Sequence, residues 1–144
     1  MRSQEPKKKR TKRTKRKTLV SNLDKYFSRF VRWSAADSDG NVKCATCDTI
    51  KHVKEMQNGH FQSRRHYSTR WLVKNCAVQC YGCNIGSQGQ QFKFSKYLDM
   101  KYGPGTAQHM EDRAALSRKY TDAELKILGQ YYKDKVDELI NKHS

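Results

Sequence analysis

The sequence predicts a small α+β domain in which helices at both ends flank a cysteine-rich centre with short strands. Apolar residues recur at helical spacing near both ends, and all five cysteines lie between residues 42 and 86, in a stretch rich in turn residues. Only 35% of the 144 residues are hydrophobic and 31% are charged. A core of ordinary size is therefore not expected, and another element must help to stabilise the fold.

The first 17 residues are dominated by positive charge. Ten of them are Lys or Arg and one is Glu, in a chain with a formal net charge of +16. A run this dense repels itself and buries nothing, which predicts a disordered basic tail over residues 1–17. Nucleic acid is the polyanion we expect it to bind, without sequence choice; the alternatives are a solubility tail and a localisation signal. The predicted contacts are Lys7, Lys8, Lys9, Arg10, Lys12, Arg13, Lys15, Arg16 and Lys17.

An amphipathic helix follows this tail. Its apolar stripe, at three- and four-residue steps, consists of Leu19, Leu23, Tyr26, Phe27, Phe30 and Val31. Thr18 or Ser21 is predicted to cap its start. The run Asp37–Asn41, which contains Gly40, predicts a tight turn into a short strand at Val42 and Lys43.

The chain is predicted to become helical again after Gly86. A helix over Gln90–Tyr102 should stop at Gly103-Pro104-Gly105, and a shorter one should run from Thr106 towards Arg118. Thr121 and Glu124 form a capping box before a final helix. The apolar face of that helix either covers the domain's own core or pairs a homodimer; it consists of Leu125, Leu128, Tyr132, Val136 and Leu139. We therefore divide the chain into a tail (1–17), a central domain (18–103) and a C-terminal helical extension (104–144).

Targeting signals are not evident in the sequence. No stretch approaches the roughly 20 apolar residues of a membrane span. No apolar segment follows the basic start, as a secretory signal would require. We expect a cytoplasmic protein without membrane contact, and its reducing surroundings favour metal binding over disulfides for the cysteines.

Two cysteine knuckles, Cys44-x2-Cys47 and Cys80-x2-Cys83, predict a structural zinc site. A two-residue spacer lets both thiolates of a knuckle reach one ion, and two knuckles complete a closed tetrahedral site. Such a site would compensate for the small core. Cys76 is left over, and we interpret it as a small buried apolar residue rather than a nucleophile.

The 32 residues between the knuckles contain side chains that suit phosphodiester chemistry. A histidine can activate water, arginines can bind phosphate oxygens, and an amide or carboxylate can hold a divalent cation. These residues are His60, Arg64, Arg65, Arg70 and Asn75. The non-catalytic alternatives are a histidine with a purely structural role and arginines that only contact phosphate.

The zinc-containing branch of the HNH nucleases resembles this chain in the order of its motif, which here is Cys44-x2-Cys47, His60, Asn75 and Cys80-x2-Cys83-Asn84. The resemblance implies a ββα-metal core held together by the two knuckles. It implies that His60 is the general base that deprotonates the attacking water, and that Asn75 braces the loop and orients His60. It also implies that Asn84 binds a catalytic Mg²⁺ or Mn²⁺.

The match is closer to one subfamily, the NinG (Rap) recombination proteins of lambdoid phages. The residues that carry it are a helix containing Leu23-Asp-Lys-Tyr-Phe-Ser-x3-Arg32, Gly59-His60-Phe61, Arg64, Thr69-Arg70-Trp71 and Gln79-Cys80. The resemblance covers roughly residues 18–103. It implies a structure-specific endonuclease acting on D-loops and Holliday junctions, located in the host cytoplasm.

Gly59 departs from the pattern of many HNH nucleases, which carry a second metal ligand just before the base. Asn58, His66 and Glu55 are the candidates for that ligand, and another reading makes His60 itself a ligand. Two functional alternatives follow: a non-catalytic, zinc-stabilised DNA-binding or packaging accessory, and an HNH enzyme that nicks ordinary duplex.

Overall fold

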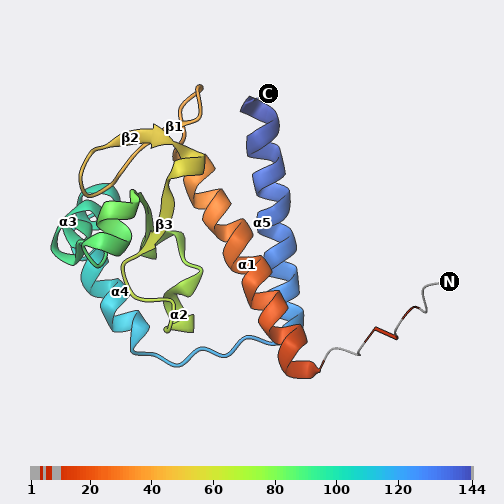
Figure 1. Cartoon of the computed structure of the whole chain (residues 1–144). Helices are drawn as coiled ribbons and strands as arrows, with labels where there is room; N and C mark the ends of the chain where they lie inside the picture. Colours follow the sequence, from red (N-terminus) through yellow and green to blue (C-terminus); the bar gives the residue numbers. More distant parts are fainter. Residues whose placement is uncertain (1–3, 5, 8–10, 144) are drawn as a thin grey trace.

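Two long helices lie side by side in the structure, a computed structural model that describes residues 4, 6–7 and 11–143. They are α1 (Lys12–Ala35) and α5 (Asp122–His143), and the strands Gln57–His60 and Cys76–Gln79 pack against α1 (Figure 1). Of the predicted tail contacts, Lys8, Lys9 and Arg10 lie outside the described residues, and Lys7 is exposed. No helix in the described part of the chain is both long and apolar enough to cross a membrane.

Short strands form two antiparallel pairs. β1 (Asn41–Lys43) pairs with β2 (Ile50–His52), and β3 (Gln57–His60) pairs with β4 (Cys76–Gln79) so that His60 lies opposite Cys76. The tight turn predicted before β1 is present, with Gly40 at a φ of 79°. Glycine adopts this left-handed conformation without steric cost.

The remaining elements are short helices and turns. They are a 3-10 turn (Val53–Glu55), α2 (Tyr67–Arg70), a second 3-10 turn (Val73–Asn75), a π-helical turn (Gly82–Gly86), α3 (Gln91–Tyr102) and α4 (Thr106–Ala114). α3 ends at the predicted Gly103-Pro104-Gly105 stop. The mixed helix and strand content agrees with the predicted α+β class.

The start of α1 corrects the prediction of a disordered tail through residue 17. The helix begins at Lys12, and Thr11 caps it by accepting a hydrogen bond from the Thr14 N–H at 3.2 Å. Thr18, one of the two predicted caps, lies inside the helix and donates to the Thr14 carbonyl. Lys and Arg are good helix formers, and Arg16 gains an ion pair with Asp122 of α5 at 2.9 Å. The basic sequence therefore extends the helix.

α5 covers the domain's own core. Leu125 and Val136 are buried, and the ring of Tyr132 meets that of Phe27 of α1 edge to face, with centroids 5.0 Å apart. Half of the predicted capping box forms: Thr121 accepts from the Glu124 N–H, while the Glu124 carboxylate binds a neighbouring arginine instead. The apolar stripe of α5 is thus occupied within the chain.

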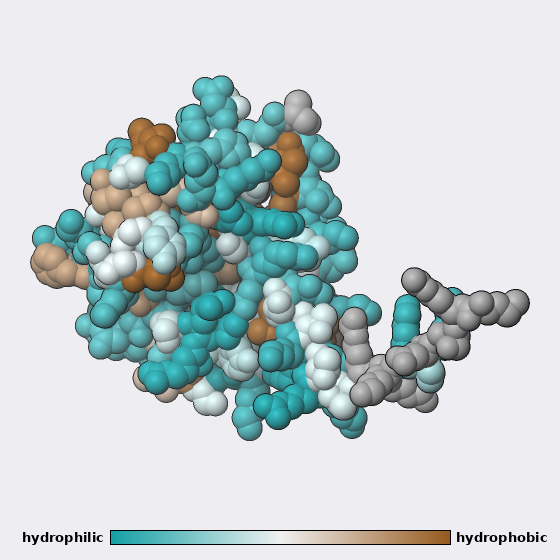
Figure 2. All heavy atoms as spheres, viewed as in Figure 1, coloured by the Kyte–Doolittle hydropathy of each residue, from teal (hydrophilic) through white to brown (hydrophobic). Residues whose placement is uncertain are grey.

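The main core cluster lies between α1, α5 and the strands, with Leu23, Phe27 and Val53 nearly or fully buried. Cys76 belongs to this cluster, is only 3% exposed, and has its thiol pKa raised by burial. The prediction of a buried, apolar Cys76 is confirmed. Outside the core, the face shown in Figure 2 is mainly hydrophilic, with separate apolar patches.

Substitution of Gly129 tests the α1–α5 contact. Gly129 is buried on α5, and a Cβ there would lie 4.0 Å from Leu23 Cα, which is an ordinary contact. We expect Gly129→Ala to raise the free energy of unfolding by about 1 kcal/mol, because alanine has the higher helix propensity. Gly129→Leu should lower it, because the helices cannot separate without losing core contacts. Urea denaturation at fixed zinc concentration measures both; equal stability of the two variants would contradict this packing.

Candidate metal centre and phosphodiester site

The two cysteine knuckles come together in space. The sulfur atoms of Cys44, Cys47, Cys80 and Cys83 all lie within 4.8 Å of one another, and Cys47 Sγ lies 3.6 Å from Cys80 Sγ. Tetrahedral zinc with Zn–S bonds of about 2.3 Å requires sulfur separations of about 3.8 Å. The four thiols therefore fit a structural metal ion such as zinc.

Neighbouring polar groups form hydrogen bonds with the sulfur atoms of this cluster, and some of these bonds favour the thiolate form that a cation needs. The Cys83 N–H donates to Cys80 Sγ at 3.4 Å. The Thr49 hydroxyl, 3.2 Å from Cys47 Sγ, and the Thr49 N–H lower the pKa of Cys47 to about 6. Burial raises the pKa of Cys83 to about 12. Because the ligands must be thiolates, metal binding has to release protons, most of all from the buried thiol.

Gln79 connects the metal cluster to β3. Its side chain is fully buried and donates to Thr46, between the first two cysteines, and to the Gly89 carbonyl. A Cβ on Gly59 would overlap the Gln79 amide. Gly59 also lies between Asn58 and His60 on a strand whose side chains alternate in direction. The absence of a side chain at this position is therefore a packing requirement.

A polar cavity of about 490 Å³ lies beside the end of β3. β3 contributes Gln57, Asn58 and His60, the π-helical turn contributes Asn84, and α1 contributes a polar row, Asp24, Ser28 and Arg32. Arg64 lies at the same cavity. The structure thus brings together the two residues assigned by resemblance to the base and the cation ligand.

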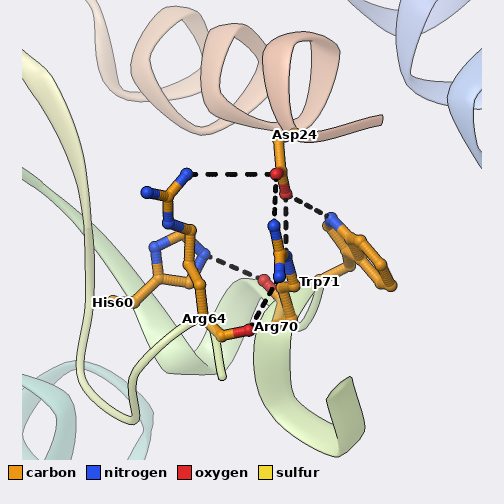
Figure 3. Close-up of polar contacts among 5 residues, drawn as sticks. All are labelled: Asp24, His60, Arg64, Arg70 and Trp71. Atoms are coloured by element: carbon orange, nitrogen blue, oxygen red, sulfur yellow. Dashed lines mark hydrogen bonds and ion pairs between the residues drawn. The ribbon is translucent and has the colours of Figure 1, made fainter. Parts of the chain in front are cut away.

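His60 is held in one orientation by a backbone carbonyl. Its Nε2 lies 2.9 Å from the Arg70 carbonyl oxygen (Figure 3). A carbonyl only accepts, so Nε2 carries the proton of the neutral ring and Nδ1 keeps the free lone pair. Burial lowers the pKa of His60, opposed by the Arg70 carbonyl and reinforced by the charge of Arg64. The ring is therefore kept neutral, with Nδ1 available to accept a proton.

Asn75 is fully buried and braces the loop between β3 and β4. Its Oδ1 accepts from the Gln62 N–H at 2.8 Å, and its Nδ2 donates to the carbonyls of Gln62 and Thr69. The Thr69 carbonyl directly precedes the one that holds His60. Asn75 therefore acts on His60 through the backbone and does not line the cavity.

Asp24 connects α1 to α2, as Figure 3 shows. Its carboxylate accepts from the Arg70 guanidinium at 2.6 and 3.1 Å and from the Trp71 indole N–H at 2.9 Å. Arg64 lies 3.9 Å away as a weaker ion pair. This clamp fixes the backbone at Arg70, whose carbonyl orients His60.

The predicted phosphate-binding arginines have different environments. Arg64 and Arg65 are exposed, and Arg64 lines the cavity. Arg70 differs from the expectation: its side chain is 15% exposed and binds Asp24 and the Arg64 carbonyl, so it is occupied within the protein. Arg32, which was not predicted to bind phosphate, lines the cavity and donates to the Val53 carbonyl at 3.0 Å.

Among the three candidates for a second cation ligand, only Asn58 lines the cavity. Both polar atoms of its amide are buried, and the amide hydrogen-bonds to the Cys76 thiol, whose pKa this bond lowers against the larger effect of burial. His66 precedes α2 and Glu55 is exposed. Asn84 donates from Nδ2 to Gln57 Oε1 at 2.7 Å, which leaves its Oδ1 as the ligand atom. These amides fit a hard cation.

Sequence reasoning missed Asp24 and Arg32 as site residues. The available signal was their spacing with Ser28, since residues 24, 28 and 32 share one helical face beside the apolar stripe. Which strand edge that face meets depends on the tertiary packing.

The chain matches the family described as Bacteriophage Lambda NinG protein over residues 1–142. It belongs to the NinG family. This membership agrees with the predicted phage and recombination context of the NinG chain. No curated protein and no solved structure matches it.

Replacing one metal ligand separates the cluster from the fifth cysteine. We expect Cys44→Ser in this NinG protein to lose stoichiometric zinc and the cooperative fold, because metal binding supplies folding free energy. Cys76→Ala, the matched control, should keep the metal and lose only about 1–2 kcal/mol of stability from the core. Elemental analysis for zinc and circular dichroism measure these changes. A folded, zinc-free Cys44→Ser protein would refute the structural role.

Proposed function

We propose that this NinG protein is a metal-dependent endodeoxyribonuclease of the HNH type that cuts branched recombination intermediates. The observation that carries the proposal is the cavity shared by His60 and Asn84, in which the His60 ring is fixed with Nδ1 free. The β3–β4 pair, followed by the turn that carries Asn84, supports assignment to the ββα-metal class.

His60 acts as the general base. Its Nδ1 accepts a proton from the attacking water, and the Arg70 carbonyl keeps the ring in place and stabilises the imidazolium that forms. Asp24 and Asn75 are positioning residues, because they act on the carbonyl rather than on the reacting atoms.

Asn84 and Asn58 would hold the Mg²⁺ or Mn²⁺ ion through their amide oxygens. When bound, a divalent cation offsets charge that develops on the phosphate and the leaving oxygen.

Arg32 and Arg64 bind the phosphate in this proposal. Arg32 is partly buried and interacts with backbone carbonyls, so it offers a fixed positive charge at the cavity. Burial and the nearby Arg29 lower its pKa, although a guanidinium remains charged at neutral pH. Arg64 is more exposed and can follow the DNA backbone.

Branched DNA is the substrate class implied by the family resemblance. The formal charge of +16 supports DNA binding in general but does not select a branch. A two-fold dimer on a four-way junction would need a surface other than the apolar stripe of α5. A non-catalytic accessory is the alternative; the glycine before His60, which favoured it, is explained by packing against Gln79.

Cleavage of labelled DNA tests the proposal. We expect wild-type protein to cut Holliday junctions and D-loops with Mg²⁺ or Mn²⁺ and to leave linear duplex intact. His60→Ala should reduce the rate by about 10²–10⁴-fold, the range of general-base catalysis, while zinc content and DNA affinity remain. Reactions without added divalent cation are the control, since chelators could remove the structural zinc. DNA bound but uncut under all conditions would support the accessory instead.

The pH dependence of cutting tests the environment of His60. Since burial and Arg64 lower its pKa, the base should be active in its neutral form down to a pH below the usual value of about 6.5. The rate should rise with pH and level off once His60 is neutral. Arg64→Gln should move the midpoint upward, and Arg65→Gln, the matched control, should leave it unchanged. A wild-type midpoint above the usual value would contradict the assignment.

A further inference from the structure

A second cavity, of about 390 Å³, lies between α2, α4 and the segment that leads to α5. We call it the α4 pocket, and the lining residues that matter here are Ser68, Asp112, Arg113, Leu116, Arg118 and Tyr120. It shares no residue with the polar cavity beside β3 that His60 lines. The two are nevertheless connected through α2, because Ser68 lines the α4 pocket and Arg70 holds His60.

Ser68 gives the first indication of a ligand. The residue is 7% exposed, and its hydroxyl is buried with no hydrogen-bond partner in the part of the chain that the structure describes. Buried polar groups are nearly always paired, and an unpaired one reduces stability. A ligand in the pocket that bonds to this hydroxyl would remove the penalty.

The other lining residues restrict the chemistry of that ligand. Leu116 is 66% exposed and offers an apolar surface at the cavity. The Arg118 guanidinium lies 4.2 Å from the centroid of the Tyr120 ring and pairs with the Glu124 carboxylate at 2.8 Å, so it offers a flat face rather than a net positive charge. Arg113 is an exposed cation, and Asp112 is an exposed carboxylate. The pocket thus combines flat and apolar surfaces, hydrogen-bonding groups and positive charge.

We propose that the α4 pocket binds an unpaired DNA base. A base has faces that pack on Leu116 and on the guanidinium of Arg118, an edge that bonds to Ser68 and Asp112, and a phosphate for Arg113. A free phosphate would not use the apolar surface, and a purely apolar ligand would not use Ser68 or the arginines. A paired base cannot enter, because its edge is occupied.

This inference rests on the proposed function only in taking DNA as the partner, and it names what the protein recognises. A D-loop contains a displaced single strand, and taking a base out of the stack costs least where that base is already unpaired. A base held at Ser68 would place its strand beside α2, and hence near the carbonyl that orients His60. The α4 pocket would then give the preference for branched over linear DNA.

The test is binding, not cleavage. Affinity is measured by fluorescence anisotropy, without added divalent cation, for a duplex with one unpaired 2-aminopurine and for the same duplex with that base paired. 2-Aminopurine emission reports whether the base is stacked. The full-length wild type should prefer the unpaired form, and emission should change on binding. Ser68→Ala and Leu116→Ser should each lower this preference by about tenfold, as for loss of one stacked or bonded base.

Two controls keep the result interpretable. Ile127→Ser removes an equally exposed apolar side chain, 69% exposed on α5, and should leave the preference unchanged. Ser68→Ala should also leave the melting temperature unchanged or raise it, because it removes an unpaired buried hydroxyl. No preference in the wild type, or the same preference in both pocket variants, would overturn the proposal. If the preference depends on the pocket but the protein cuts no DNA, the proposed nuclease function is wrong and the proposed base-binding pocket stands.

Discussion

The proximity of two cysteine knuckles is the constraint on which the centre of the molecule depends. Cys44 follows β1 and Cys80 follows β4, so one ion would join the two hairpins. The Ala45 N–H, which donates to the Val78 carbonyl, and buried Gln79 reinforce the same junction. In a chain with 35% hydrophobic residues, a metal ion held by these thiols would supply order that a larger core would otherwise provide.

α1 joins this cysteine-rich centre to the rest of the fold. One face carries Leu23 and Phe27, which pack in the main core against α5. The neighbouring face carries Asp24 and Arg32, which reach α2 and the cavity beside β3. The same helix therefore supports the core and shapes the polar site, so damage to the α1–α5 contact should also disturb the orientation of His60.

The short helix α2 is connected to both cavities. This helix has only four residues, yet its backbone holds His60, its Arg70 side chain binds Asp24, and its Ser68 lines the α4 pocket. A helix so short has little stability of its own and depends on tertiary contacts. In the proposed function, binding at Ser68 would influence the orientation of His60 without any long-range change in structure, and would connect the proposed base recognition to the proposed cutting.

The sequence alone determined the stop of α3, the gathering of four cysteines into one cluster that fits a metal ion, and the burial of Cys76, while the family resemblance grouped His60 with Asn84. These features follow from local rules: turn chemistry, ligand spacing and motif order. Only the tertiary structure decided that the helix begins at Lys12, that Arg70 is occupied by Asp24 and that Gly59 is required by Gln79. The last two depend on a partner distant in sequence, since Arg70 meets Asp24 and Gly59 meets Gln79, and the helix start gains such a partner where Arg16 meets Asp122. Local patterns carry no information about such partners, because burial and charge pairing are set by how the elements pack.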